Sequence, residues 1–228
     1  MIHGVEIWVE GSNDAKVIEL LLKKHDLKFD IQWKPASPGE IRIAGSVEKL
    51  LDAMKVQISQ RRSQPVGFVI DADIDPGNPG SSIQNRWNSI RNKLKELGLE
   101  SPLRPDTTGT ILEGVVNGIP SRVGIWLMPN NTDDGMLEHF LQELIQQDDL
   151  LLPIATKATA EASATDRRFP VVHTQKAIIH TWLAWQKDPG LQLGMAITSN
   201  SFRYDRPHAI SFVNWFRTLF GLESPVVP

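Results

Sequence analysis

The feature that most constrains the fold is an unbroken apolar run, Val66–Ile70 (VGFVI), which is followed by the acidic sequence Asp71-Ala72-Asp73-Ile74-Asp75. A strand with no polar residue on either face must be covered on both sides, and such strands are typical of parallel sheets with helices on each face. Strand-like and helical segments alternate over the first 150 residues, which is the order that a parallel sheet requires. We therefore expect an α/β fold with a mainly parallel sheet flanked by helices.

The individual elements are predicted from hydrophobic spacing and from turn residues. Strands are expected at residues 5–9, 28–33, 110–116 and 122–128, with a short extension at 41–43. Helices are expected at residues 15–24, from Ser46 through Ile58, at 83–97, and from Asn131 or Thr132 through Leu144. Residues 155–166 (ATKATAEASATD) suit either a helix or a loop, and further helices are expected at 171–186 and 210–220. We expect an α/β core in residues 1–150 and a mainly helical C-terminal extension, 151–228, packed on it.

Composition excludes several classes of protein. The chain has 228 residues and no cysteine, which excludes a disulfide framework, a thiolate zinc site and a cysteine nucleophile. The first residues lack the pattern of a secretory signal and no apolar stretch approaches 18 residues, so we expect a cytoplasmic protein that does not enter a membrane. The formal net charge is −3 and the pI is near 6.1. A nucleic-acid role would therefore need a local basic face, a metal ion or a partner protein.

Polar side chains follow three of the expected strands. They are Glu10, then Asp71, Asp73 and Asp75, and then Asn130 and Asn131. In open parallel sheets, ligands bind beyond the carboxyl ends of the strands, so one crevice could collect these side chains. Carboxylates that share a cleft repel one another, and a divalent cation removes that repulsion. Because hard oxygen ligands select Mg²⁺ or Mn²⁺ over softer metals, we expect one of these ions as the cofactor.

At these positions the chain resembles the Toprim domain of topoisomerases, primases and overcoming-lysogenization-defect nucleases. Glu10-Gly11 follows the first strand, and Asp71-x-Asp73 follows a later one. The nuclease branch also has an acid four residues after the glutamate, which Asp14 matches, and a lysine further on, for which Lys176 is the candidate. The segments EGSNDAKVI, DADID and MPNNTDDGMLEHFL are similar to a small bacterial family of uncharacterised Toprim-like proteins, and the resemblance covers roughly residues 5–145.

The resemblance implies divalent-metal-dependent phosphodiester chemistry on DNA or RNA, carried out directly or through a partner protein. Asp71 and Asp73 would be primary metal ligands. Glu10 would bind a metal or act as a general base. Lys176 would stabilise charge on the phosphate in the transition state.

The remaining ligands are less well defined. Asp14 or Asp75 would complete one metal site. Asn130 or Asn131 stands where a second metal usually has carboxylates, and an amide supplies only neutral oxygen. The nearby acids that could compensate are Asp133, Asp134 and Glu138.

Each feature also has an ordinary structural reading. Aspartates form turns after strands, and acids in a first helical turn favour the helix dipole. Basic side chains such as Lys176 and Arg86 are common on helix surfaces, although Arg86 could belong to a patch that faces phosphate. His173 and His180 share a helix face without a third ligand, so we do not expect a zinc site there.

Two other functions are compatible with the sequence. A hydrophobic strand followed by Asp-x-Asp also describes haloacid-dehalogenase-like phosphatases, although that motif normally opens the chain and leaves Glu10 unexplained. The fold could alternatively serve as a catalytically weak or inactive interaction module that binds metal or nucleotide, since fold does not determine function. An EF-hand calcium loop from Asp71 is excluded because its sixth position is Pro76 and its twelfth is Ser82.

Overall fold

The computed structural model describes residues 5–27, 41–60 and 64–222. Their elements in chain order are β1 (Ile7–Val9), α1 (Ser12–Lys24), β2 (Ile41–Ile43), α2 (Val47–Gln60), β3 (Val66–Asp71), α3 (Ser82–Glu96), β4 (Thr110–Val116), β5 (Ile119–Met128), α4 (Leu137–Glu143), α5 (Leu151–Asp166), the 3-10 helix η1 (Val171–His173), α6 (Thr174–Ala184), α7 (Leu193–Thr198) and α8 (Pro207–Phe220). The strand expected at residues 28–33 lies outside the described residues. Residues 155–166, which suited either a helix or a loop, are part of α5.

The strands form one sheet in the order β2-β1-β3-β5-β4. The pairs β1–β2, β1–β3 and β3–β5 are parallel, whereas β4 pairs antiparallel with β5 at the sheet edge. The turn between β4 and β5 is Asn117-Gly118, and both residues have positive φ (51° and 79°), as a tight type I′ hairpin requires. The prediction of an α/β fold with a mainly parallel sheet is confirmed.

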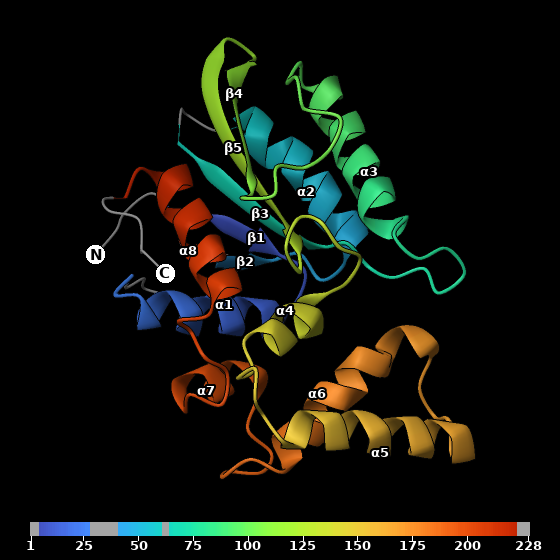
Figure 1. The fold of residues 1–228 in the computed structure, drawn as a ribbon. Helices are drawn as coiled ribbons and strands as arrows, with labels where there is room; N and C mark the ends of the chain where they lie inside the picture. The colour runs from blue at the N-terminus through green and yellow to red at the C-terminus, as the bar shows by residue number, and fades with distance from the viewer. Residues whose placement is uncertain (1–4, 28–40, 61–63, 223–228) are drawn as a thin grey trace.

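Alternate residues of the central strands face opposite layers of helices, which is why the apolar run in β3 has no polar face. Phe68 and Ile70 belong to the hydrophobic cluster that contains α2 and α3. Val69 and, on β5, Trp126 belong to the cluster that contains α1 and α8. Figure 1 shows α2 and α3 on one side of the sheet and α1 and α8 on the other. The centre of the sheet is therefore buried between two helical layers, as the apolar run Val66–Ile70 predicted.

The C-terminal region is helical, as expected, and its last helix lies directly against the sheet. Gly67 and Gly124 make room for α8: a Cβ at Gly124 would lie 2.4 Å from a Leu219 methyl carbon, and one at Gly67 would lie 3.1 Å from the same atom. Trp126 packs edge-on to Phe212, with ring centroids 5.2 Å apart. Residues close to the C-terminus thus cover the strands that lie at the centre of the sheet.

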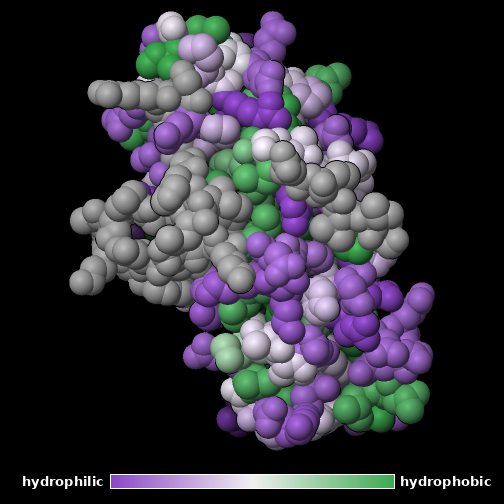
Figure 2. Space-filling view, turned by 90° about the vertical axis from the view of Figure 1, so that its left-hand side faces the viewer, coloured by the Kyte–Doolittle hydropathy of each residue, from purple (hydrophilic) through white to green (hydrophobic). Residues whose placement is uncertain are grey.

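Helices α5, α6 and α7 lie together at one end of the molecule, away from the sheet (Figure 1). In Figure 2, hydrophilic side chains dominate the surface of this end, with smaller hydrophobic groups between them. Helix α7 packs on α1, where a Cβ at Gly194 would lie 2.9 Å from the carbonyl oxygen of Lys16. Among the helices that the structure describes, none combines the length and the apolar character that crossing a membrane would need.

The prediction that Asn131 or Thr132 caps a helix is wrong, because α4 begins at Leu137 and its N-cap is Met136. Asn131 has a φ of 64°, which a right-handed helix cannot contain. Its Oδ1 accepts the Leu127 N–H at 2.8 Å, and the Oδ1 of Asn130 accepts the N–H groups of Thr132 and Asp133. These amides close a loop in place of a first helical turn.

Candidate metal centre

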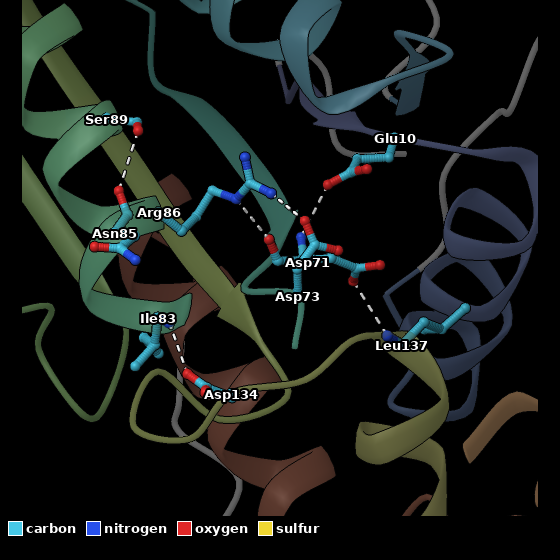
Figure 3. A network of polar contacts seen from close by, with 9 residues as sticks. All are labelled: Glu10, Asp71, Asp73, Ile83, Asn85, Arg86, Ser89, Asp134 and Leu137. Carbon is cyan, nitrogen blue, oxygen red and sulfur yellow. Dashed lines mark hydrogen bonds and ion pairs between the residues drawn. The ribbon is translucent and has the colours of Figure 1, made fainter. Parts of the chain in front are cut away.

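Glu10 and Asp71 meet at the carboxyl end of the sheet. They follow or end β1 and β3, which are adjacent and parallel, so the ends of both strands point to the same edge. The Asp71 N–H donates to Glu10 Oε1 at 3.0 Å (Figure 3). Of the side chains expected in one crevice, the structure thus brings the Glu10 carboxylate to the backbone of Asp71.

Two further backbone contacts fix the carboxylates of this group. Asp71 Oδ1 accepts the N–H of Leu137, the first residue of α4, at 3.1 Å. Asp14 Oδ2 accepts the N–H of Gly11, which precedes α1, at 3.1 Å. Each carboxylate thus satisfies a backbone donor near a helix start, where helices leave such donors unpaired. The group is assembled by β1, α1, β3 and α4 together.

Asp73 lies beyond the end of β3, so its position is set by the loop and not by the alternation of side chains along a strand. Strand β3 ends at Asp71, and Asp73 has a φ of 66°, in the left-handed region that residues other than glycine rarely adopt. Its N–H donates to the carbonyl of Gly135 at 2.8 Å, which forms an isolated antiparallel bridge. The Asp73 carboxylate forms an ion pair with Arg86, whose Nε donates to the Asp71 carbonyl at 3.0 Å (Figure 3).

Burial and neighbouring negative charges raise the pKa values of Glu10 and Asp14. Burial raises the pKa of Glu10 to about 7, and the charges of Asp14 and Asp73 add to the increase. The Asp71 N–H and the Arg86 charge act in the opposite direction. Burial also raises the pKa of Asp14 to about 6, with a further contribution from the buried Glu138.

The same effects act on Asp71. Burial raises its pKa well above the ordinary value, and the charges of Asp14 and Glu10 follow in importance. Glu138 and Asp73 contribute in the same direction. Five carboxylates from four segments of the chain therefore share one electrostatic environment, in which negative charge is unfavourable without a counter-ion.

Lys176 lies at the border of this group. Its Nζ is 3.7 Å from Oε1 of Glu138, and its charge lowers the pKa of Asp14. Glu138 is buried, whereas 46 % of the Lys176 side chain is exposed. The structure therefore brings Glu138, Asp14 and Lys176 to the same place as Glu10 and Asp71.

Three other candidates have local roles elsewhere. Asp75 is exposed and its Oδ1 accepts the Gly77 N–H, which is a turn contact. Asn130 bonds within its own loop and donates to Asp133. Asp134 accepts the N–H groups of Gly80 and Ile83 with its two oxygens, at the start of α3, and Figure 3 shows it apart from Glu10 and Asp71.

The donor chemistry of the group fits a hard divalent cation, because carboxylate oxygens are the ligands that Mg²⁺ and Mn²⁺ prefer. Within residues 5–27, 41–60 and 64–222, however, no three His, Asp or Glu side chains are arranged as they stand to hold one metal ion. One carboxylate oxygen of each of Glu10, Asp71 and Asp14 accepts a backbone N–H. The residues that could hold a metal ion, after reorientation of their side chains, are Glu10, Asp71 and Asp73, with Asp14 and Glu138 beside them.

Sequence reasoning did not single out Arg86, which it treated as one of several basic helix residues. Its side chain is only 14 % exposed, and it contacts both aspartates of the Asp-x-Asp pair. The available signal was its position early in the helix that follows this pair, where helix geometry directs a long side chain back toward the strand end.

Comparison with curated proteins found no match, and comparison with solved structures found none either. The family described as "Protein of unknown function (DUF3226)" matches residues 5–221, a range that includes the whole acidic group and the helix α8 behind it. The chain belongs to this family.

Proposed function

We propose that the group formed by Glu10, Asp71 and Asp73 binds Mg²⁺ or Mn²⁺ and serves in the hydrolysis of phosphodiester bonds in nucleic acid. The observation that carries the proposal is the contact between Glu10 and the Asp71 backbone, which brings two strand ends together. Burial, together with the charges of neighbouring carboxylates, raises the pKa values of Glu10 and Asp71. Repulsion between buried negative charges lowers the stability of the folded chain, so we take it as a sign of ligand binding.

The residues of the chain divide into two kinds. Glu10, Asp71 and Asp73 would hold the ion, and Asp14 and Glu138 would extend the negative surface. When bound, a divalent cation neutralises charge on a phosphate group and makes a water molecule more acidic. Lys176 stands beside Glu138 and is placed to attract a phosphate oxygen that approaches the group.

A second candidate is a module that binds a metal ion or a nucleotide without catalysis. It is favoured by the hydrogen bonds that Asp71 and Asp14 make with the backbone, because these stabilise the fold whether or not an ion is bound. The haloacid-dehalogenase-like phosphatase remains a third reading, and it differs from the first in its substrate.

The test combines metal binding with cleavage. Full-length protein, stripped with EDTA, is titrated with Mn²⁺ by calorimetry and then incubated with labelled single- and double-stranded DNA and RNA. Loss of a residue that merely supports a metal ligand typically costs 10- to 100-fold in metal affinity. Loss of a ligand should cost at least as much, so D71N and E10Q should each weaken Mn²⁺ binding by at least about tenfold. D71N should also abolish any metal-dependent cleavage.

The control is D188N, which removes a carboxylate from an exposed position in the loop after α6. It should leave Mn²⁺ affinity and cleavage unchanged. Absence of Mn²⁺ binding at millimolar concentration would overturn the metal centre. Binding without cleavage of any nucleic acid would favour the non-catalytic module, and turnover of p-nitrophenyl phosphate alone would favour the phosphatase.

A further inference from the structure

Arg86 contacts the end of β3 at two points. Its Nε donates to the backbone carbonyl of Asp71 at 3.0 Å, and its Nη2 forms an ion pair with the carboxylate of Asp73. The two acceptors belong to the two aspartates of the Asp-x-Asp pair, so the guanidinium spans them (Figure 3). With 14 % exposure, this arginine side chain is largely buried, whereas arginine side chains are mostly exposed in proteins.

The helix that carries Arg86 is itself fixed near the acidic group. The two carboxylate oxygens of Asp134 accept the N–H groups of Gly80 and Ile83, at 2.6 and 2.7 Å. Ile83 lies three residues before Arg86, so the first turn of α3 is tied to the loop that follows β5. The start of the helix that carries Arg86 is therefore anchored by Asp134, and the Arg86 side chain is anchored by the Asp71 carbonyl.

We infer that Arg86 is a built-in counter-ion of the acidic group, which pairs with the Asp73 carboxylate in the metal-free protein and competes with a divalent cation for it. The inference rests on the proposed function, since it concerns the cation that the group would bind. The Asp73 side chain is 53 % exposed and so remains accessible to an ion from solution. When the ion binds, it replaces Arg86 as the partner of the Asp73 carboxylate. The hydrogen bond from Arg86 Nε to the Asp71 carbonyl can persist.

This arrangement makes Arg86 a positioning residue for Asp73. In the metal-free protein the ion pair holds a carboxylate that would otherwise be repelled by Glu10, whose pKa is raised by the Asp73 charge. When the pair opens, the guanidinium stays next to the group because its Nε is bonded to the β3 backbone. A freed Nη2 would then face the same space as the ion, where a phosphate oxygen would be its natural partner.

The experiment measures Mn²⁺ affinity by calorimetry for wild type, R86Q, D73N and the double variant R86Q/D73N. We expect R86Q to bind Mn²⁺ about fivefold more tightly than wild type. The ion must displace Arg86 from Asp73 in wild type, and breaking a half-exposed ion pair lowers a binding constant by about that factor. In the D73N background, R86Q should change the affinity by less than twofold, since the carboxylate for which Arg86 competes is absent. R86K, which keeps the charge but cannot span both acceptors, should lie between wild type and R86Q.

The matched control is K93Q, which removes the same charge from the same helix, where Lys93 pairs with Asp52 at 3.0 Å. It should leave Mn²⁺ affinity unchanged. Weaker or unchanged binding in R86Q would overturn the inference, because an arginine with only a structural role predicts that result. An equal gain in the presence and absence of Asp73 would also overturn it, by showing a general charge effect. If wild type itself does not bind Mn²⁺, the proposed function fails and not merely the role of Arg86.

Discussion

Glu10 shows how one carboxylate can belong to the fold and to the site together. Its Oε1 accepts the Asp71 N–H, a bond that holds the ends of β1 and β3 against each other. Burial makes the ionised form of Glu10 less favourable, and the charges of Asp14 and Asp73 add to this effect. At the scale of a single residue, Glu10 therefore keeps its proton to a higher pH than an ordinary glutamate does.

We predict that the stability of the metal-free protein falls as the pH rises through the range in which Glu10 titrates. The pKa of Glu10 is about 7 in the folded chain against an ordinary value of 4.5, so between these values the folded state binds more protons than the unfolded state. Stability from this group is complete below pH 4.5 and is lost as the pH approaches 7. With about 1.4 kcal/mol for each pKa unit, and a discount for partial exposure, the loss should be about 1 to 2 kcal/mol.

Urea denaturation in EDTA, at pH 5 and at pH 8, measures this effect as the difference between wild type and E10Q. The glutamine can still accept the Asp71 N–H but carries no charge, so its stability should depend less on pH than that of wild type. Equal pH dependence in the two proteins would contradict the prediction.

At the scale of elements, sequence patterns predicted the type of each element better than its first residue, which tertiary contacts can set. Strand β4 was placed at Thr110–Val116, as found, because alternation and turn residues are local. The cap of helix α4 was placed five or four residues too early, because Asn131 and Thr132 are residue types that commonly cap helices, whereas the observed cap is Met136. The donor at the true start, Leu137 N–H, is satisfied by Asp71 from β3, 66 residues earlier in the chain, which no local pattern shows.

The acidic site was predictable to a similar degree. Strand ends predicted the meeting of Glu10 with Asp71, since adjacency of parallel strands is a topological rule. The pattern could not show that Asp73 would adopt a left-handed conformation or that Arg86 would pair with it. Nor could it separate Asp134, which caps a helix, from Glu138, which joins the acidic group. These differences are set by loops, whose backbone conformation is not encoded in hydrophobic periodicity.

Asp134 provides the prediction at this scale. We expect D134A to lower the free energy of unfolding by about 1 to 2 kcal/mol, because the backbone donors of Gly80 and Ile83 lose their acceptor at the start of α3. Urea denaturation measures the change. The matched control, D133A, removes the neighbouring exposed acid, which accepts a hydrogen bond from the Asn130 side-chain amide. It should lower the free energy of unfolding by less than half as much. Equal effects would mean that the cap does not stabilise α3.

At the scale of the whole molecule, the first strand and the last helix pack in the same hydrophobic core. One hydrophobic cluster includes Ile7 of β1, Trp126 of β5 and Phe216 of α8. The spacing of residues 210–220 predicted a helix but not its place against the sheet. The glycines opposite it, Gly67 and Gly124, were a readable signal, because a glycine inside a buried strand often marks the close approach of another element.

This packing leads to a prediction about the boundary at residue 150. We expect the fragment 1–150 not to fold cooperatively on its own, although it contains the whole sheet and most of the acidic group. Without α8, the side of the sheet that carries Val69, Trp126 and Met128 would be covered only in part, by α1, and exposed apolar area of that kind costs about 25 cal/mol per Å². Lys176, the partner of Glu138, would also be missing.

Thermal unfolding followed by circular dichroism, together with binding of a hydrophobic dye, compares the fragment 1–150 with the chain 1–222. The longer chain should melt in one sharp transition and bind little dye, whereas the fragment should melt gradually and bind dye strongly, as chains do when helices persist without fixed packing. A variant of the full chain, G124V, tests the same interface without truncation: its side chain would enter the space of Leu219, and overpacking of this kind typically costs about 1 to 3 kcal/mol. G77V, at an exposed loop position with a negative φ, should cost much less. A sharp transition in the fragment would show that residues 1–150 form an independent domain, and α8 would then be a cover that the sheet can lose.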